Sequence, residues 1–173
     1  MHFTKFGRAV GGFERDIKNA ERYLNAAAKH EPDIQLACIS YHSALLEAGI
    51  SLRYVKTEGQ RARYDKAVNR LGQLQKSLVE YGIRMAERKL EEAHRSITDE
   101  ERRVKEAREV GLPAKPIYTS ARTGVLSAEM SITPLLKAPN IGDNDRYTKL
   151  LVPIVDRILE LRRLLEAKKA VAA

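Results

Sequence analysis

A heptad pattern of apolar residues constrains the fold of this chain more than any other feature. Between residues 59 and 102, apolar side chains recur at alternating intervals of three and four, which predicts a long amphipathic helix that packs against other helices. The apolar positions are Tyr64, Ala67, Leu71, Leu74, Leu78, Tyr81 and Met85. From residue 86 the pattern shifts by one residue and continues at Leu90, Ala93 and Ile97. Such a shift alters the supercoiling locally.

Three further segments have helical periodicity, so the sequence predicts an all-α, bundle-like fold of four or five helices, with two long helices paired antiparallel. The first helix is expected over 13–30. The second is expected over 32–56, where apolar residues occupy nearly every face, which is typical of a central helix. A last helix begins near Asp143, and Pro153 is expected to kink or restart it. Its apolar positions are Tyr147, Leu151, Ile154, Ile158, Leu161 and Leu165.

Four segments follow from this pattern. Residues 1–12 are expected to form a basic arm with a glycine hinge that reaches onto a neighbouring subunit. Residues 13–111 form the helical domain, and 143–173 the C-terminal helix. Between them, 112–142 is rich in Pro, Ser and Thr and is expected to be an irregular connection; a short helix near its centre is compatible with the sequence.

Basic residues also follow the long helix, and they lie on one strip of its surface. At about 100° per residue, seven cations fall within an arc of about 60°, and the strip is about 60 Å long. No Asp or Glu enters this arc between Gly59 and Thr98. A row of like charges is costly unless an anionic partner lies along it, and nucleic-acid phosphates repeat along a line. This basic strip comprises Arg63, Lys66, Arg70, Arg84, Arg88, Arg95 and Arg102.

The basic strip therefore predicts binding to the phosphates of nucleic acid, with duplex DNA favoured and RNA also compatible. Lys5 and Arg8 of the arm are expected to contribute. The alternative is a solvated basic face that is balanced by acidic residues on other helices. The net charge of +8 and the sequence pI of about 9.6 agree with a polyanionic partner but do not choose between the two interpretations.

Composition bounds the location and the chemistry. Cys38 is the single cysteine, so an internal disulfide is excluded, and no apolar run is long enough to span a membrane. The N-terminus lacks the apolar core of a signal peptide, so we expect an intracellular protein or one enclosed in a virion. Scarce Asn, Gln and Cys suggest a thermophilic source. No phosphate-binding loop, Ser-His-Asp pattern or metal-ligand spacing occurs, which predicts a non-enzymatic protein without metal, cofactor or small-molecule substrate.

One short motif suggests an enzyme instead. Arg88 and His94 have the spacing of the ribonuclease motif of HEPN domains, which are small all-helical nucleases, and residues 40–46 are similar to the second helix of that family. Lys89 departs from the motif, because the family usually has Asn, Asp or His at that position. The resemblance implies RNA cleavage. A surface Arg and His on a charged helix is the competing interpretation.

In architecture and charge, the chain resembles the helical nucleocapsid proteins of filamentous archaeal viruses, which wrap DNA with paired helices. This resemblance implies a coat or packaging protein that binds nucleic acid without sequence preference and self-assembles. Other open alternatives are a helical subunit of an RNA-guided complex and a coiled-coil assembly protein. Since the second helix is too short to cover the whole apolar stripe, we expect a homo- or hetero-oligomer whose interface contains Leu90, Ala93 and Ile97.

Overall fold

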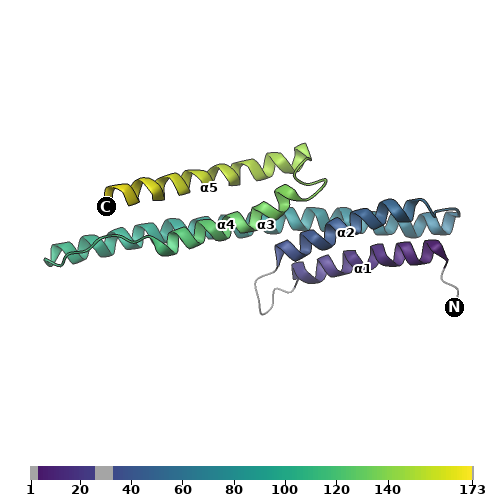
Figure 1. The fold of residues 1–173 in the computed structure, drawn as a ribbon, viewed down its shortest axis with the longest axis horizontal. Coiled ribbons are helices and arrows are strands. Elements are labelled where there is room, and N and C mark those ends of the chain that lie inside the picture. The colour runs from purple at the N-terminus through teal and green to yellow at the C-terminus, as the bar shows by residue number, and fades with distance from the viewer. Residues whose placement is uncertain (1–3, 26–32, 173) are drawn as a thin grey trace. The chain divides into compact units, whose positions relative to one another are not determined.

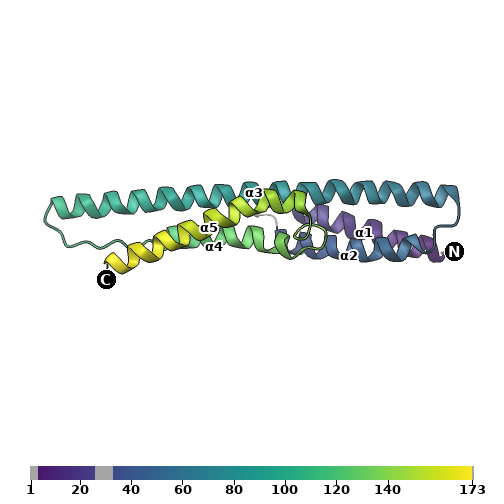
Figure 2. The same ribbon diagram turned by 90° about the horizontal axis from the view of Figure 1, so that it is seen from above.

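The computed structural model describes residues 4–25 and 33–172, and these residues form five α-helices and no strand (Figures 1 and 2). The all-α, bundle-like class is thereby confirmed. The helices are α1 (Lys5–Asn25), α2 (Ile34–Leu52), α3 (Glu58–Glu109), α4 (Thr119–Lys137) and α5 (Asp145–Ala172). None of the helices in the described ranges is both long enough and apolar enough to cross a membrane.

The chain divides into two compact units, and α3 contributes to both. The first unit contains Met1–Tyr81 and Pro134–Asn144, and therefore α1, α2 and the first part of α3. The second contains Gly82–Thr133 and Asp145–Ala173, and therefore the rest of α3, most of α4 and all of α5. Each unit is thus built mainly from three helices, with part of α3 as one of them.

α1 begins within the segment that was expected to be an arm. Its first turn is capped by Thr4, whose Oγ1 accepts a hydrogen bond from the Gly7 amide at 3.1 Å. Phe6 and Val10 continue the apolar periodicity of the helix towards the N-terminus and are buried. The predicted arm is therefore wrong over residues 5–12, and the glycines there are helical; residues 1–3 lie outside the described residues.

Interhelical contacts fix the direction of the helices in the first unit. Glu14 pairs with Arg63 and Glu21 pairs with Arg70, so both members advance by seven residues and α1 runs parallel to α3. α2 runs antiparallel to α1: its Ser43 donates a hydrogen bond to Asp16 at 2.5 Å, and its later residue Glu47 lies against the earlier Gly12. The buried core contains Phe13 and Ile17 of α1, Tyr41 of α2 and Leu71, Leu74 and Leu78 of α3.

In the second unit, as in the first, successive helices run in opposite directions. Glu87 and Glu101 of α3 contact Arg157 and Lys168 of α5, so α3 and α5 are parallel. The expectation that the two long helices are antiparallel is therefore wrong. The reason is α4, an additional helix that reverses the chain once more: its Tyr118 end contacts Glu101, and Gly124 lies against Ala93.

α4 corrects the prediction of an irregular connection over 112–142. Gly111, with φ of +77°, ends α3, and the Leu112 amide donates to the Ala107 carbonyl at 2.9 Å, as in a Schellman motif. Irregular backbone then continues only to the start of α4. Ala121, Val125, Ala128 and Ile132 are buried at intervals of four and three, which is the period of a helix.

α4 and α5 also cover the surface that was expected to bind another subunit. Leu90 and Ala93 are fully buried and Ile97 is 5% exposed. A Cβ at Gly124 would lie 3.0 Å from the Ala93 Cβ, so the two backbones approach closely there. The predicted oligomer interface at Leu90, Ala93 and Ile97 is therefore wrong, because the chain buries these residues itself.

Candidate nucleic-acid interface

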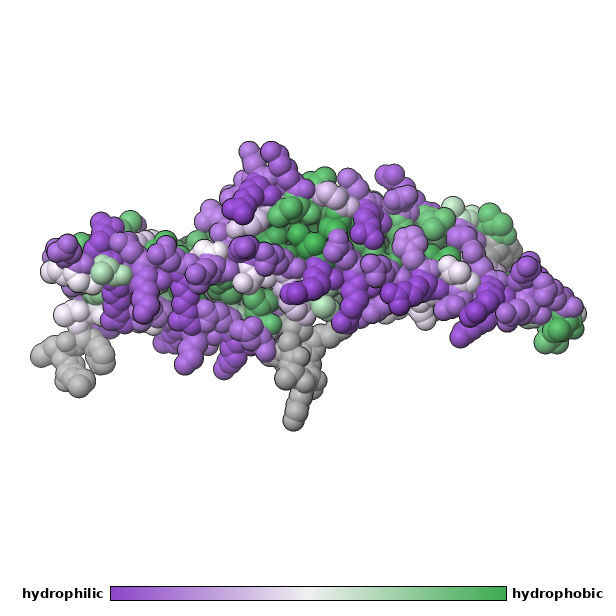
Figure 3. Space-filling view, turned by 180° about the vertical axis from the view of Figure 1, so that it is seen from behind, coloured by the Kyte–Doolittle hydropathy of each residue, from purple (hydrophilic) through white to green (hydrophobic). Residues whose placement is uncertain are grey.

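The structure places all seven residues of the basic strip on exposed positions of α3, and Lys5 and Arg8 on exposed positions of α1. Hydrophilic side chains predominate on the face of the molecule drawn in Figure 3. The strip is a real surface feature, but its charge is partly neutralised, and its two ends differ in how this happens.

At the N-terminal end, carboxylates from α1 reach the strip. Arg63 donates from Nε and Nη2 to the two oxygens of Glu14 at 2.9 and 2.6 Å. Seven residues further along both helices, Arg70 binds Glu21 in the same two-point geometry, with its Nε at 2.6 Å. These α1–α3 salt bridges have the fork geometry that gives Arg–carboxylate pairs their specificity. They supply the acidic balance that an inspection of α3 alone does not detect.

The α1–α3 salt bridges shift the pKa of Glu14, Arg63 and Arg70. The hydrogen bond from Arg63 lowers the pKa of Glu14 below its ordinary 4.5; burial opposes this shift, and the charges of Arg63, Arg70 and Lys66 add to it. The pKa of Arg63 and that of Arg70 are raised by their hydrogen bonds to the partner carboxylates. These shifts favour the ionised forms of Glu14, Arg63 and Arg70.

At the C-terminal end, the strip is neutralised within α3. Arg88 contacts Glu92 at 3.3 Å and Arg95 contacts Glu91 at 3.5 Å, each across one helical turn. Arg102 binds Asp99 at 3.0 Å. Exposed pairs of this kind contribute about 0.3–0.5 kcal/mol each, so their cations exchange partners at little cost.

A groove of about 470 Å³ between α1 and α3 collects further cations. Besides Arg63, Lys66 and Arg70, it is lined by Arg15 and Lys18 of α1. Two of these five cations pair closely with carboxylates, Arg63 with the lining residue Glu14 and Arg70 with Glu21, which leaves Arg15, Lys18 and Lys66. No carboxylate of the described residues forms an ion pair with Lys18 or Lys66 in the structure, and the Arg15 contact to Asp16 is long, at 3.9 Å.

α1 extends this groove into a larger basic surface. On its outer face Arg8, Arg15, Lys18 and Arg22 lie within an arc of about 80° that contains no Asp or Glu. Three of them are spaced by seven residues, which was the available sequence signal for the missed residues Arg15 and Arg22. We define the α1–α3 basic surface as Arg8, Arg15, Lys18, Arg22, Arg63, Lys66 and Arg70.

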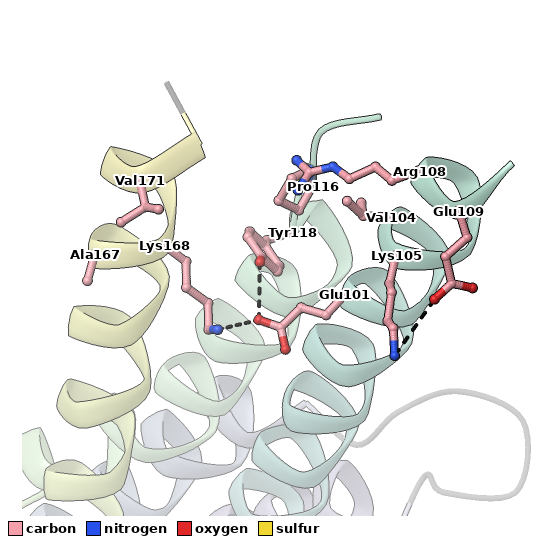
Figure 4. Close-up of a pocket in the computed structure, with 10 residues that line it drawn as sticks. All are labelled: Glu101, Val104, Lys105, Arg108, Glu109, Pro116, Tyr118, Ala167, Lys168 and Val171. Atoms are coloured by element: carbon pink, nitrogen blue, oxygen red, sulfur yellow. Dashed lines mark hydrogen bonds and ion pairs between the residues drawn. The ribbon is translucent and has the colours of Figure 1, made fainter. Parts of the chain in front are cut away.

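A second concave feature lies at one end of the second unit (Figure 4). Its volume is about 810 Å³, and Tyr118 and Lys168 both donate to the Oε1 of Glu101, Tyr118 at 3.3 Å. The Lys168 hydrogen bond lowers the pKa of Glu101, while burial and then the Glu101 charge raise that of Tyr118. The pKa of Lys168 is raised by Glu101. These shifts favour the ionised forms of Glu101 and Lys168. A stable ion pair of this kind suits a structural role better than acid–base or nucleophilic catalysis.

The residues of the nuclease-like motif do not converge. Arg88 and His94 both belong to α3, where six residues separate them by about 120° around the axis. The hydroxyl of Thr98 donates to the His94 carbonyl at 3.3 Å, so the helix continues through this position. Within the described ranges, no group of His, Cys, Asp and Glu is arranged to hold a metal ion.

No protein-family model, curated protein or solved structure matches this chain.

Proposed function

We propose that this chain is a non-enzymatic nucleic-acid-binding protein that coats or packages nucleic acid, as a nucleocapsid or virion-type subunit does, inside a cell or a particle. It contacts the phosphates and does not read the bases. Duplex DNA is the favoured ligand, because its two strands present phosphates to both helices of a rigid surface.

The observation that carries this proposal is the excess positive charge of the α1–α3 basic surface. Seven cations lie on two parallel helices, and Glu14 and Glu21 pair closely with two of them, Arg63 and Arg70. Cations spaced by seven residues on one helix stand about 10.5 Å apart, so each helix presents a regular row of charges. The C-terminal part of the basic strip is a weaker extension of the same surface, because Arg88, Arg95 and Arg102 each pair with a carboxylate one helical turn away.

The decisive experiment compares two sets of charge removals. The site variant is Arg15→Gln, Lys18→Gln and Lys66→Gln. It removes Lys18 and Lys66, which form no ion pair with the described residues, and Arg15, whose contact to Asp16 is 3.9 Å long. The control variant is Lys149→Gln, Arg163→Gln and Lys169→Gln, which removes three exposed cations of α5. Both lower the net charge by three, so any difference between them reports the position of the charges.

Binding is measured by fluorescence anisotropy with two 30-base-pair duplexes of unrelated sequence over a series of salt concentrations. Each phosphate contact adds about 0.9 to the slope of log affinity against log salt. We expect the site variant to lose about two to three units of slope on both duplexes, and the control to lose less than one. Equal losses in the two variants, or retention of both affinity and slope by the site variant, contradict the proposal.

A further inference from the structure

The outward face of α2 exposes a row of large apolar side chains. Leu36, Ile39, Leu46 and Ile50 are 39%, 56%, 61% and 43% exposed, whereas Ala37, Tyr41, Ala44 and Ala48 on the opposite face are buried. The sequence pattern predicted a central helix, and the structure shows instead a helix with one face covered. The half-buried Ser43, whose hydroxyl donates to Asp16 of α1 at the edge of this face, and the exposed Arg53 complete alternating intervals of three and four. We call Leu36, Ile39, Ser43, Leu46, Ile50 and Arg53 the α2 stripe.

We propose that the α2 stripe is an interface between two copies of this chain, which pack α2 against α2 as an antiparallel helix pair. This is an interaction surface distinct from the α1–α3 basic surface, and it does not rest on nucleic-acid binding. A stripe with this spacing is the seam that a second helix covers in a coiled coil. An exposed seam of this size on a helix of a folded unit is otherwise unfavourable in water.

The α2 stripe of one copy is complementary to the α2 stripe of a second copy that runs in the opposite direction. In one register, every stripe position of one copy meets a stripe position of the other. Ile39 then packs on Ile50 of the second copy, Ser43 on Leu46, and Leu36 on the aliphatic part of Arg53. The two most exposed side chains, Ile39 and Leu46, lie on either side of the centre of this interface, where a second copy removes most water.

Charge selects the antiparallel direction. Arg53, at the C-terminal end of the stripe, comes beside Asp33 of the second copy, which caps the N-terminus of α2. A parallel pair would instead place Arg53 against Arg53. Like charges disfavour that arrangement.

The residues around the stripe argue against a lipid surface as the occupant. An amphipathic helix that lies on a membrane usually carries Lys and Arg on its polar face. α2 contains no Lys or Arg, and Arg53 follows its last residue. The flanking positions are held by Gln35, His42, Gly49 and Glu47, a composition without Lys or Arg that suits a second copy of the same helix.

Gly49 offers a specific signature of this packing. It is exposed in α2, and a Cβ placed there would meet nothing within 4 Å. In the antiparallel register, Gly49 lies opposite His42 of the second copy, where the absence of a side chain leaves room for the imidazole. Ala at this position improves helix propensity in the single chain but narrows the gap between two chains.

The test is sedimentation velocity of the full chain over a concentration series, without nucleic acid. Leu46→Glu should raise the dimer dissociation constant by at least about thirtyfold, as expected for a central interface residue. The matched control is Leu126→Glu on α4, where Leu126 is 55% exposed, and it should leave the constant unchanged. Gly49→Ala should weaken the dimer by about tenfold, whereas Gly72→Ala, also open in the structure, should not.

The register is tested by cross-linking in a Cys38→Ala background. Chains with Ile39→Cys and chains with Ile50→Cys should form mixed disulfides under mild oxidation, and neither should cross-link to itself. Self-linked Ile39→Cys chains would overturn the antiparallel register. A monomer at all concentrations, equal dissociation by Leu46→Glu and Leu126→Glu, or flotation of the wild type with phosphatidylglycerol vesicles that Leu46→Glu abolishes would overturn the proposed interface.

Discussion

Removing the two carboxylates of the α1–α3 salt bridges separates their structural role from the charge of the surface. The perturbation is Glu14→Gln together with Glu21→Gln, which keeps the shape of both side chains but releases Arg63 and Arg70. In the folded chain these carboxylates hold the guanidinium groups in a two-point geometry. The double variant should therefore be less stable than the wild type and should bind nucleic acid more tightly.

The size of the stability effect follows from exposure. The side chains of Arg63 and Glu14 are 47% and 37% exposed, so water and salt screen the pair strongly. Exposed pairs contribute up to about 1 kcal/mol each, which gives a loss of up to about 2 kcal/mol for both. For a chain of this length, about 2–4 °C in Tm accompanies each kcal/mol, so Tm should fall by up to about 8 °C.

The binding effect has the opposite sign. Two released guanidinium groups should each gain a phosphate contact, and the salt slope should steepen by about two units. Chemical unfolding in urea and anisotropy over a salt series measure the two effects on the same protein. The control is Glu80→Gln with Glu109→Gln, which removes two exposed carboxylates that pair within α3 with Lys76 and Lys105. A double variant that loses stability while its salt slope matches that of the control would refute the reasoning that Arg63 and Arg70 reach phosphate.

Three further predictions concern stability. Leu90→Ala should lower the free energy of unfolding by about 2–5 kcal/mol in urea titrations, because Leu90 is fully buried, and it should leave the oligomeric state unchanged in light scattering. Gly142→Ala should lower Tm, because its Cβ would overlap the Leu136 carbonyl oxygen, whereas Gly72→Ala, open in α3, should raise stability by up to about 1 kcal/mol. The pKa of Glu14 is lower in the folded state than its ordinary 4.5. Its stabilising contribution is therefore complete well above pH 4.5 and is lost as the pH falls through the folded pKa. Glu14→Gln should make the urea midpoints of unfolding at pH 6 and pH 3 more similar than they are in the wild type.

Periodicity alone was sufficient for the helices whose apolar faces are wide and uninterrupted. The buried positions of α5, from Tyr147 to Leu165, match the predicted stripe. In α3 the match holds from Ala67 to Leu78 and again from Leu90 to Ile97. Between these segments Val79 and Ala86 are buried in place of the predicted Tyr81 and Met85, which are half-buried. Pro153 lies on the exposed face of α5 and does not interrupt it. In these segments local spacing and tertiary burial agree, so one sequence was enough.

The sequence prediction was wrong in two segments, the expected arm and the expected irregular connection. In both, glycines or prolines were given more weight than the helical spacing of the apolar residues. Gly11 and Gly12 suggested a hinge, although Phe6 and Val10 continued the helical spacing. The Thr4 cap and burial outweigh the helix propensity that is lost at glycine. In α4 two of the buried positions are alanines, and small side chains give a weak pattern. They are nonetheless suited to close packing on α3, as the approach of Gly124 to Ala93 demonstrates.

From the sequence, the charge pattern could be interpreted only one helix at a time. The exposure of the basic strip could therefore be predicted, but its partial neutralisation by carboxylates of another helix could not. All seven cations of the basic strip are exposed as expected, yet no property of α3 alone identifies the carboxylates that neutralise Arg63 and Arg70. Those come from α1, and their spacing of seven residues equals that of the arginines, which is the pattern that two parallel helices of matched register produce. The same interval recurs at Arg8, Arg15 and Arg22, so α1 carries one heptad row of acids towards α3 and another of cations towards solvent. The excess positive charge of this unit therefore lies on the outer side of the α1–α3 salt bridges, where a phosphate backbone has access to it without first displacing either carboxylate.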